Sequence, residues 1–335
     1  MSKLGLIQVC LAGVLWGTAG LVAAVLHDDH GLGATTTSAW RMVVATAALL
    51  AFVMIAQRTR QVVAAVRARP LTMVVLGCGT AVYQGLYFLA VLAVGVSVAT
   101  VVSLGLAPLL AAAWEHSRTR TRPTLRELLV LTAALVGLVL VSLASAGHGA
   151  PGDDPALGVL LAVAAGATYA VTTVLGHHLA RDVDPLALTT GGTTVGAVVL
   201  APFLILAAAQ GGPVVATDPT ALLLVVYLGV VTMALSYGLL YAGLRTVAGS
   251  AATVATLVEP LSAAALAVWL LDERLTAPAV LGGLLILTAV AGLRPAPRDE
   301  SPSHEIGDAS GHSPEGRRPD AAHIRDGLSA PRSPR

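Results

Sequence analysis

Hydrophobic residues fall in long stretches separated by short polar segments, which is the pattern of helices that cross a lipid bilayer. A helix that crosses a hydrocarbon core of about 30 Å needs roughly 20 mostly apolar residues. Stretches of this kind occur at residues 4–26, 35–56, 71–94, 97–114, 125–146, 157–179, 186–209, 220–240, 250–271 and 278–293. The sequence therefore predicts an all-α membrane protein with about ten transmembrane helices.

The composition supports a lipid environment. The 335 residues are 56% hydrophobic and only 12% charged, with a mean hydropathy of +0.79. Soluble domains average about 25% charged residues, and a soluble chain this apolar has too few polar groups to cover its surface. The lipid bilayer is therefore expected to be a partner of the protein.

Polar segments divide the chain into four parts. A turn-rich linker at 147–156 separates a first half, residues 5–146, from a second half, residues 157–293. From residue 294 to 335 the composition changes to Arg, Pro, Asp, Ser, Gly and His. Such a segment buries too little apolar surface to offset its conformational entropy, so we expect a disordered tail.

Arginine and lysine gather on one side of the predicted spans, and this asymmetry indicates orientation. With the N-terminus inside, the inner side receives Lys3, Arg58, Arg60, Arg67, Arg69, Arg118, Arg120, Arg122, Arg126, Arg181, Arg245, Arg294 and Arg298, and the outer side only Arg274. Both termini are thus predicted to be cytoplasmic. Abundant Ala, Gly and Arg with little Lys is typical of a GC-rich bacterial genome and predicts the inner membrane.

The two halves resemble each other in order and spacing. Residues 128–133 (LLVLTA) match 284–289 (LLILTA), and a proline lies in the span before each, Pro108 and Pro260. Because each half holds an odd number of spans, the copies must be inverted relative to each other. Two inverted five-helix repeats are typical of secondary transporters, whose binding site lies at the repeat interface near the membrane midplane.

Residues 257–276, which include Glu259-Pro260, resemble the second-half signature of EamA-type transporters in the drug/metabolite transporter superfamily. The segments 13–18 and 40–42 are also similar to that family. The resemblance implies ten helices in two EamA repeats and transport of small metabolites or drugs, often as export. Two positions depart from the pattern: the first half has Trp114-Glu115-His116 in place of a Gly-Glu-Arg-like turn, and Ala107 in place of Glu259.

No catalytic motif is present, so we predict no enzymatic activity. The sequence has no His-Glu-x-x-His, no Gly-x-Ser-x-Gly and no phosphate-binding loop. Active transport would then depend on an ion gradient, the membrane potential or solute exchange. No cofactor, metal or nucleic acid is expected, and the sequence carries no signal of oligomeric state.

Charges inside apolar spans are costly and normally face a cavity or a partner. Glu259 is therefore a candidate for binding a proton or another cation; the alternative is a structural carboxyl beside the Pro260 kink, either neutral or hydrogen-bonded to Ser, Thr or Tyr groups. Arg41 is a candidate for binding an anionic part of the substrate or for pairing with Glu259. Its alternative role is to extend toward the lipid headgroups.

Aromatic and amide side chains form a second candidate set for substrate binding. Rings of this set can stack on a planar or cationic substrate while hydroxyls and amides read its polar groups. The set comprises Trp16, Tyr83, Gln84, Tyr87, Tyr169, Tyr237 and Tyr241. Interfacial placement is the alternative for any membrane tyrosine, and it fits Tyr241 best.

These patterns predict a carrier that exports a small metabolite, amino acid or drug-like solute by alternating access. Import of the same solutes is an alternative, because nothing in the sequence determines direction. A membrane receptor or scaffold that signals through the tail is the alternative from another class. Deleting the tail distinguishes them, since a carrier keeps its flux and a sensor loses its output.

Overall fold

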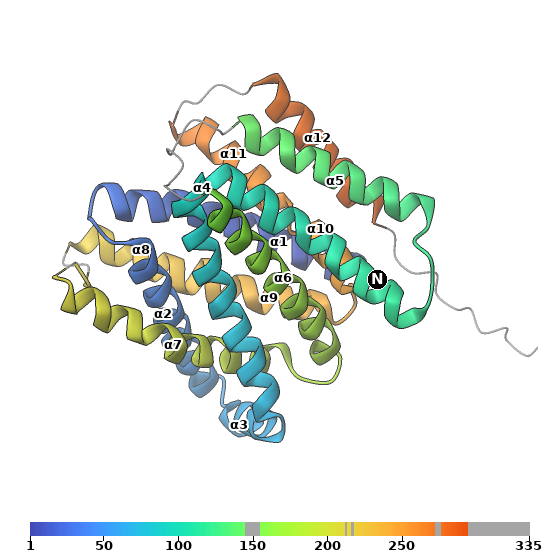
Figure 1. Ribbon diagram of the computed structural model, residues 1–335. Coiled ribbons are helices and arrows are strands. Elements are labelled where there is room, and N and C mark those ends of the chain that lie inside the picture. The colour runs from blue at the N-terminus through green and yellow to red at the C-terminus, as the bar shows by residue number, and fades with distance from the viewer. Residues whose placement is uncertain (145–154, 212, 216–217, 272–275, 294–335) are drawn as a thin grey trace, which may run out of the picture. The chain divides into compact units, whose positions relative to one another are not determined.

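The computed structural model describes residues 1–144, 155–211, 213–215, 218–271 and 276–293, all within one compact unit that spans Met1–Ala296. Within these residues it is entirely helical (Figure 1). The first half contains α1 (Lys3–Asp28), α2 (Ala34–Ile55), α3 (Thr59–Ala68), α4 (Pro70–Thr119) and α5 (Leu125–Ala144). The second contains α6 (Pro155–Ala180), α7 (Pro185–Ala209), α8 (Pro219–Gly229), the π-helix η1 (Val230–Leu235), α9 (Ser236–Leu244), α10 (Gly249–Ala255), α11 (Val258–Leu271) and α12 (Ala277–Gly292). The predicted tail and most of the linker lie outside the described residues.

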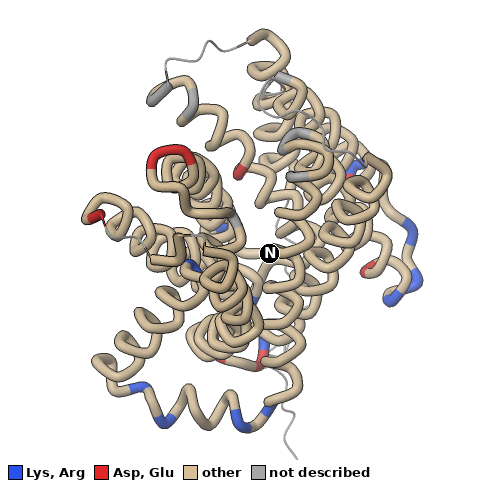
Figure 2. Tube along the Cα trace, turned by 60° about the vertical axis from the view of Figure 1, so that its left-hand side comes forward, with Lys and Arg blue, Asp and Glu red and all other residues tan. Residues whose placement is uncertain are grey.

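The helices confirm the predicted membrane fold. In the described part of the chain, 9 helical segments are long and apolar enough to cross a membrane, and Ala277–Gly292 is a shorter apolar helix. Large apolar side chains such as Ile55 and Trp269 are 82% and 77% exposed. A surface with such large exposed apolar side chains is favourable in contact with lipid and unfavourable in contact with water. Figure 2 shows charged residues mainly at helix ends and in connections.

A single glycine joins the third and fourth spans. Helix α4 contains both spans, Pro70–Val91 and Val98–Thr119, and between them Gly95 adopts φ 80° and ψ 162°. Other residues rarely adopt a positive φ of this kind, because their Cβ atom clashes with the backbone. Gly95 therefore lets the chain change direction without a polar loop.

Helices of the two halves pack against one another rather than forming separate bundles. The closely packed pairs α4–α6, α5–α12, α2–α7 and α1–α11 each take one helix from each half, and Figure 1 shows α5 beside α12. At the α5–α12 contact a Cβ atom on Gly137 would lie 2.6 Å from the carbonyl oxygen of Gly282, and the reverse distance is also 2.6 Å. Small residues thus allow the close approach expected between membrane helices.

The structure adds a short helix, α3, between the second and third spans. Its apolar face carries the buried Val62 and packs on α7. Ion pairs flank it, with 3.1 Å between Arg58 and Asp184 and 3.5 Å between Arg69 and Asp182. These contacts tie the connection of the first half to the turn between α6 and α7.

Candidate functional site

A cavity of about 150 Å³ lies between the two halves. Helices α1, α2 and α4 of the first half and α6, η1, α9 and α11 of the second half contribute to its wall. The lining residues are Trp16, Ala19, Gly20, Ala23, Arg41, Tyr83, Gln84, Tyr87, Phe88, Tyr169, Met233, Tyr237 and Glu259. On α1 they run from the middle of the helix toward its carboxyl end, so the cavity extends toward the end predicted to face outside.

The structure brings eight of the nine predicted site residues together around this cavity; the ninth, Tyr241, lies apart. The cavity wall also contains Phe88, Met233 and the small residues of α1, which were not predicted. Phe88 follows Gln84 by four residues, and Met233 precedes Tyr237 by four, so helical spacing around the predicted residues was the available signal. Whether these residues bind substrate stays a prediction.

Aromatic rings form the larger part of the wall. Trp16 packs on Tyr237 with 5.1 Å between ring centroids, and Tyr83 stacks on Tyr169 at 5.0 Å. The hydroxyl of Tyr169 is 2.9 Å from Thr256 Oγ1, and that of Tyr87 is 2.7 Å from Thr100 Oγ1. These bonds hold two rings in place, so the stacked faces form a rigid apolar surface.

Tyr241 is buried inside the bundle, whereas the predicted alternative, interfacial placement, would expose its ring to the lipid headgroups. It is only 4% exposed and lies beside a second cavity of about 10 Å³ with Thr80, Thr172 and Thr173. Its ring centroid is 6.0 Å from that of Tyr237. A space of this size holds about one water molecule. Tyr241 therefore packs behind the wall of the main cavity, against Tyr237, and does not line it.

The two candidate charges face the same cavity without forming a direct pair. Arg41 Nη2 donates to Thr232 Oγ1 at 3.3 Å, which turns the side chain inward rather than toward headgroups. Among the described residues, the Glu259 carboxylate accepts no hydrogen bond and neither charge belongs to an ion pair. Of the structural alternative for Glu259, the hydrogen bonds to Ser, Thr or Tyr hydroxyls are therefore not observed among the described residues.

Three polar side chains in the wall have buried atoms without a hydrogen-bond partner in the described structure. These atoms are Trp16 Nε1, Arg41 Nε and both amide atoms of Gln84. Gln84 is 6% exposed. Buried polar groups are nearly always hydrogen-bonded, and leaving one unpaired costs about 1–3 kcal/mol. The hydroxyls of Thr37, Ser38 and Thr46 on α2 are likewise without a partner in the described structure and lie outside the wall, so unpartnered polar atoms surround the cavity as well as line it.

The backbone is irregular on the second-half side of the site. The helix breaks at Thr256 and Leu257, and α11 begins at Val258. Pro260 therefore lies in the first turn of α11, where proline is tolerated, and not in a helix interior as the sequence predicted. Helix η1, which holds Met233, is a π-helix, and π-helical segments occur frequently at functional sites.

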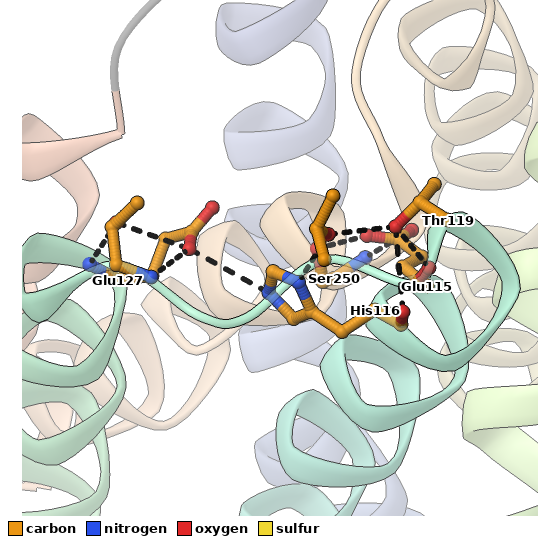
Figure 3. Close-up of polar contacts among 7 residues, drawn as sticks. Glu115, His116, Thr119, Glu127 and Ser250 are labelled. Atoms are coloured by element: carbon orange, nitrogen blue, oxygen red, sulfur yellow. Dashed lines mark hydrogen bonds and ion pairs between the residues drawn. The ribbon is translucent and has the colours of Figure 1, made fainter.

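Polar contacts gather around the carboxyl end of α4, and one of them, between Glu115 and Ser250, joins the two halves (Figure 3). Glu115, near the end of α4, accepts hydrogen bonds from the backbone N–H of Ser250, at 3.1 Å, and from its hydroxyl. His116 Nε2 lies 3.5 Å from Glu127 Oε2 and so links α4 to α5. Ser2 Oγ is 2.8 Å from Thr246 Oγ1. At this end, predicted to be cytoplasmic, the Glu115–Ser250 and Ser2–Thr246 contacts therefore join the two halves, whereas the His116–Glu127 pair lies within the first half.

Comparison with known proteins gives consistent matches along most of the chain. Residues 3–143 and 156–294 each match the EamA-like transporter family. An uncharacterized transporter of Bacillus subtilis (strain 168), YwfM, is 30% identical over 294 residues, covering 87% of this chain and 94% of that protein. An uncharacterized inner membrane transporter of Salmonella typhimurium, YicL, is 27% identical, covering 86% and 94%.

A solved structure shares the fold. A crystal structure whose title gives no function superposes with a TM-score of 0.73 at 20% sequence identity, covering 87% of this chain and 96% of the other. At this identity the likeness shows the fold alone. It agrees with an all-helical arrangement of two repeats.

Proposed function

Because this chain belongs to the EamA-like transporter family and is a membrane transporter, we propose that its central cavity binds a small metabolite, amino acid or drug-like solute and exports it by alternating access. The protein would act in the bacterial inner membrane with both termini in the cytoplasm. Its relatives include a transporter named for the inner membrane, and the predicted charge asymmetry supports this orientation.

The observation that carries the proposal is the composition of the cavity wall. Residues from both halves contribute aromatic rings, one arginine, one glutamate and an unpartnered amide to a space of about 150 Å³. Small-molecule sites combine apolar walls with a few polar groups that determine orientation. A site between repeats is also where a rocking motion of one half against the other would change its access.

The contacts at the predicted inner end support an arrangement with the cavity directed outward. The Glu115–Ser250 hydrogen bonds join α4 to α10 at that end, while the cavity extends toward the opposite end of α1. Opening to the cytoplasm would require these bonds to break. We infer that they form the inner gate.

Energy for active transport would come from an ion gradient or from solute exchange, because the sequence has no nucleotide-binding loop. Glu259 is the proposed coupling residue. It is a partly buried carboxyl in the cavity wall without an ion-pair partner among the described residues. It can therefore bind a proton in one state and a cationic group of the solute in another.

Untargeted metabolite profiling of cells and medium tests this function. A deletion strain, an overexpressing strain and a Glu259→Gln variant are compared at equal membrane expression, with Glu127→Gln as the control at an exposed carboxyl outside the cavity. Export predicts one solute that accumulates inside the deletion strain and outside the overexpressor, with the effect lost in Glu259→Gln and kept in Glu127→Gln. The export proposal would be contradicted if no solute followed gene dosage in either rich or minimal medium.

A further inference from the structure

Helix α3 presents one face to the bundle and leaves the opposite face exposed. The inward face consists of apolar side chains that pack into the core of the bundle, namely Val62, Ala65 and Val66. Arg58 and Arg69, which flank this face, form ion pairs with the carboxylates of Asp184 and Asp182. The contacts of α3 with the rest of the protein therefore all belong to its inward face and its two ends.

The outward face of α3 combines two arginines with two small apolar side chains. Arg60, Val63, Ala64 and Arg67 are exposed and follow the spacing i, i+3, i+4 and i+7 of one helix face. Neither arginine belongs to an ion pair among the described residues. The sequence offers no local carboxylate either, because residues 30–114 include no Asp or Glu. This face thus carries two positive charges without a neighbouring carboxylate.

The apolar outer surface of the bundle reaches both ends of α3. Ile55, at the end of α2, is 82% exposed, and Leu71, at the start of α4, is 74% exposed. Helix α3 joins these two helices and runs across the lower end of the bundle in Figures 1 and 2. Because exposed apolar side chains of this size favour lipid, α3 lies at the level where the hydrocarbon region meets the headgroups. Val63, which is 39% exposed, suits the apolar side of that boundary.

We propose that the outward face of α3 binds anionic phospholipid headgroups in the leaflet predicted to face the cytoplasm. Arginine presents a planar fork of N–H groups that binds a phosphate through parallel hydrogen bonds. Arg60 and Arg67 are two turns apart, roughly 10 Å along the helix axis, so each can bind a separate phosphate while Val63 contacts the acyl chains. The amine of a zwitterionic lipid would bring a further positive charge to the arginines, so an anionic headgroup is favoured. This inference does not depend on which solute is transported.

A second basic segment on the same predicted side provides a matched comparison. Arg118 and Arg122 are exposed in and beside the turn between α4 and α5, but Glu115 and Glu127 lie close to them in sequence. General attraction to an anionic membrane depends on charge near its surface, so both arginine pairs contribute to it. A headgroup bound at a particular site depends on the α3 pair alone.

Native mass spectrometry of the purified full-length protein tests the site. The protein in mild detergent is mixed with equal amounts of dioleoyl phosphatidylglycerol and dioleoyl phosphatidylethanolamine, and the retained lipids are counted. We expect the wild type to retain phosphatidylglycerol preferentially. Replacing both arginines of the outward face, Arg60→Gln with Arg67→Gln, should weaken this binding about 10-fold or more. Arg118→Gln with Arg122→Gln removes the same charge and should keep the affinity within about twofold of the wild type.

A nitroxide label at position 63 measures whether this face meets lipid. The label is attached to Val63→Cys in a protein that also carries Cys10→Ser and Cys78→Ser, in vesicles of phosphatidylethanolamine and phosphatidylglycerol. We expect this label to collide more often with oxygen, which dissolves in lipid, than with a water-soluble nickel chelate. A label at Pro123→Cys, in the turn between α4 and α5, should show the reverse.

Three results would overturn the inference. An equal loss of phosphatidylglycerol in the Arg118 and Arg122 variant would show that overall charge alone attracts the lipid. Unchanged retention in the Arg60 and Arg67 variant would show that this face holds no headgroup. A label at position 63 that the nickel chelate reaches as readily as position 123 would place the face in water and leave it to a protein partner.

Discussion

The two halves share an arrangement of helices around the cavity but differ in the charged residues that they contribute to it. Counted from the first residues of the two matched segments, 3 and 156, Trp16 corresponds to Tyr169 and Gln84 to Tyr237. All four line the cavity. By the same count Arg41 corresponds to Thr194. At these equal distances from the start of each segment both halves place an aromatic or amide side chain in the wall, whereas the basic group is present in one half only.

The acidic group is equally one-sided. By this count Glu259 corresponds to Leu106, and by its neighbouring proline to Ala107; both are apolar. The surrounding helix also differs, because Pro108 lies inside the continuous helix α4 and Pro260 lies in the first turn of α11. The second half thus places its carboxyl beside a helix break that the first half lacks. A solute that passes through meets opposite charges on the two sides.

The largest expected effect comes from removing the acidic charge. Glu259→Gln leaves a cationic group of the solute without its partner, and truncating one member of a buried charge pair costs about 2–5 kcal/mol. Export should fall by about 30-fold or more at unchanged membrane expression. Flux of the profiled solute from loaded cells measures this. A rate within twofold of the wild type would mean that the charge difference between the halves has no role in transport.

Substitutions of Arg41 should cause the second-largest fall in export rate. This fall should depend on the geometry of the side chain as well as on its charge. Arg41→Ala should abolish export without lowering membrane expression. Arg41→Lys keeps the charge but loses the planar fork, so we expect a rate about 10-fold lower. Equal rates for the lysine and alanine variants would show that the fork matters more than the charge, and a wild-type rate for Arg41→Ala would show that the side chain is dispensable.

Weakening the contact that joins the halves at the predicted inner end should have a smaller effect. It should change the ratio of inward-open to outward-open protein. Glu115→Gln or Ser250→Ala weakens the hydrogen bonds between α4 and α10. Because this site is only half-buried, we expect a loss of about 1 kcal/mol, a change of about fivefold in the ratio of inward-open to outward-open protein.

This ratio can be measured with a cysteine engineered at Thr80, which lines the second cavity. The rate at which the cysteine reacts with a membrane-permeant thiol reagent reports the ratio. The reaction should be faster in both variants than in a Glu127→Gln control carrying the same cysteine. An unchanged rate in both variants would show that the contact is not part of a gate.

Much of this arrangement is predictable from the sequence, because hydropathy and buried polarity leave strong local signals. The spans follow from apolar run length, and Arg41, Gln84 and Glu259 stand out as polar groups inside those spans. Helix α3 and the glycine that reverses α4 depend on one or two residues with ordinary local patterns. The break before Glu259 and the burial of Tyr241 depend on packing between distant helices, which no local pattern records.

The smallest effects should separate Trp16 from its counterpart Tyr169. The Tyr169 hydroxyl is already hydrogen-bonded to Thr256, so Tyr169→Phe should lower the free energy of unfolding by about 1 kcal/mol and change solute affinity little. Trp16 lines the cavity, so Trp16→Phe should weaken solute binding several-fold, and its smaller ring should also lower the free energy of unfolding by about 1–3 kcal/mol. Chemical denaturation and solute titration of both purified variants measure the two quantities. A loss of solute affinity in Trp16→Phe alone would mean that only this half uses the position to bind the solute, whereas unchanged affinity in both variants would return both residues to packing.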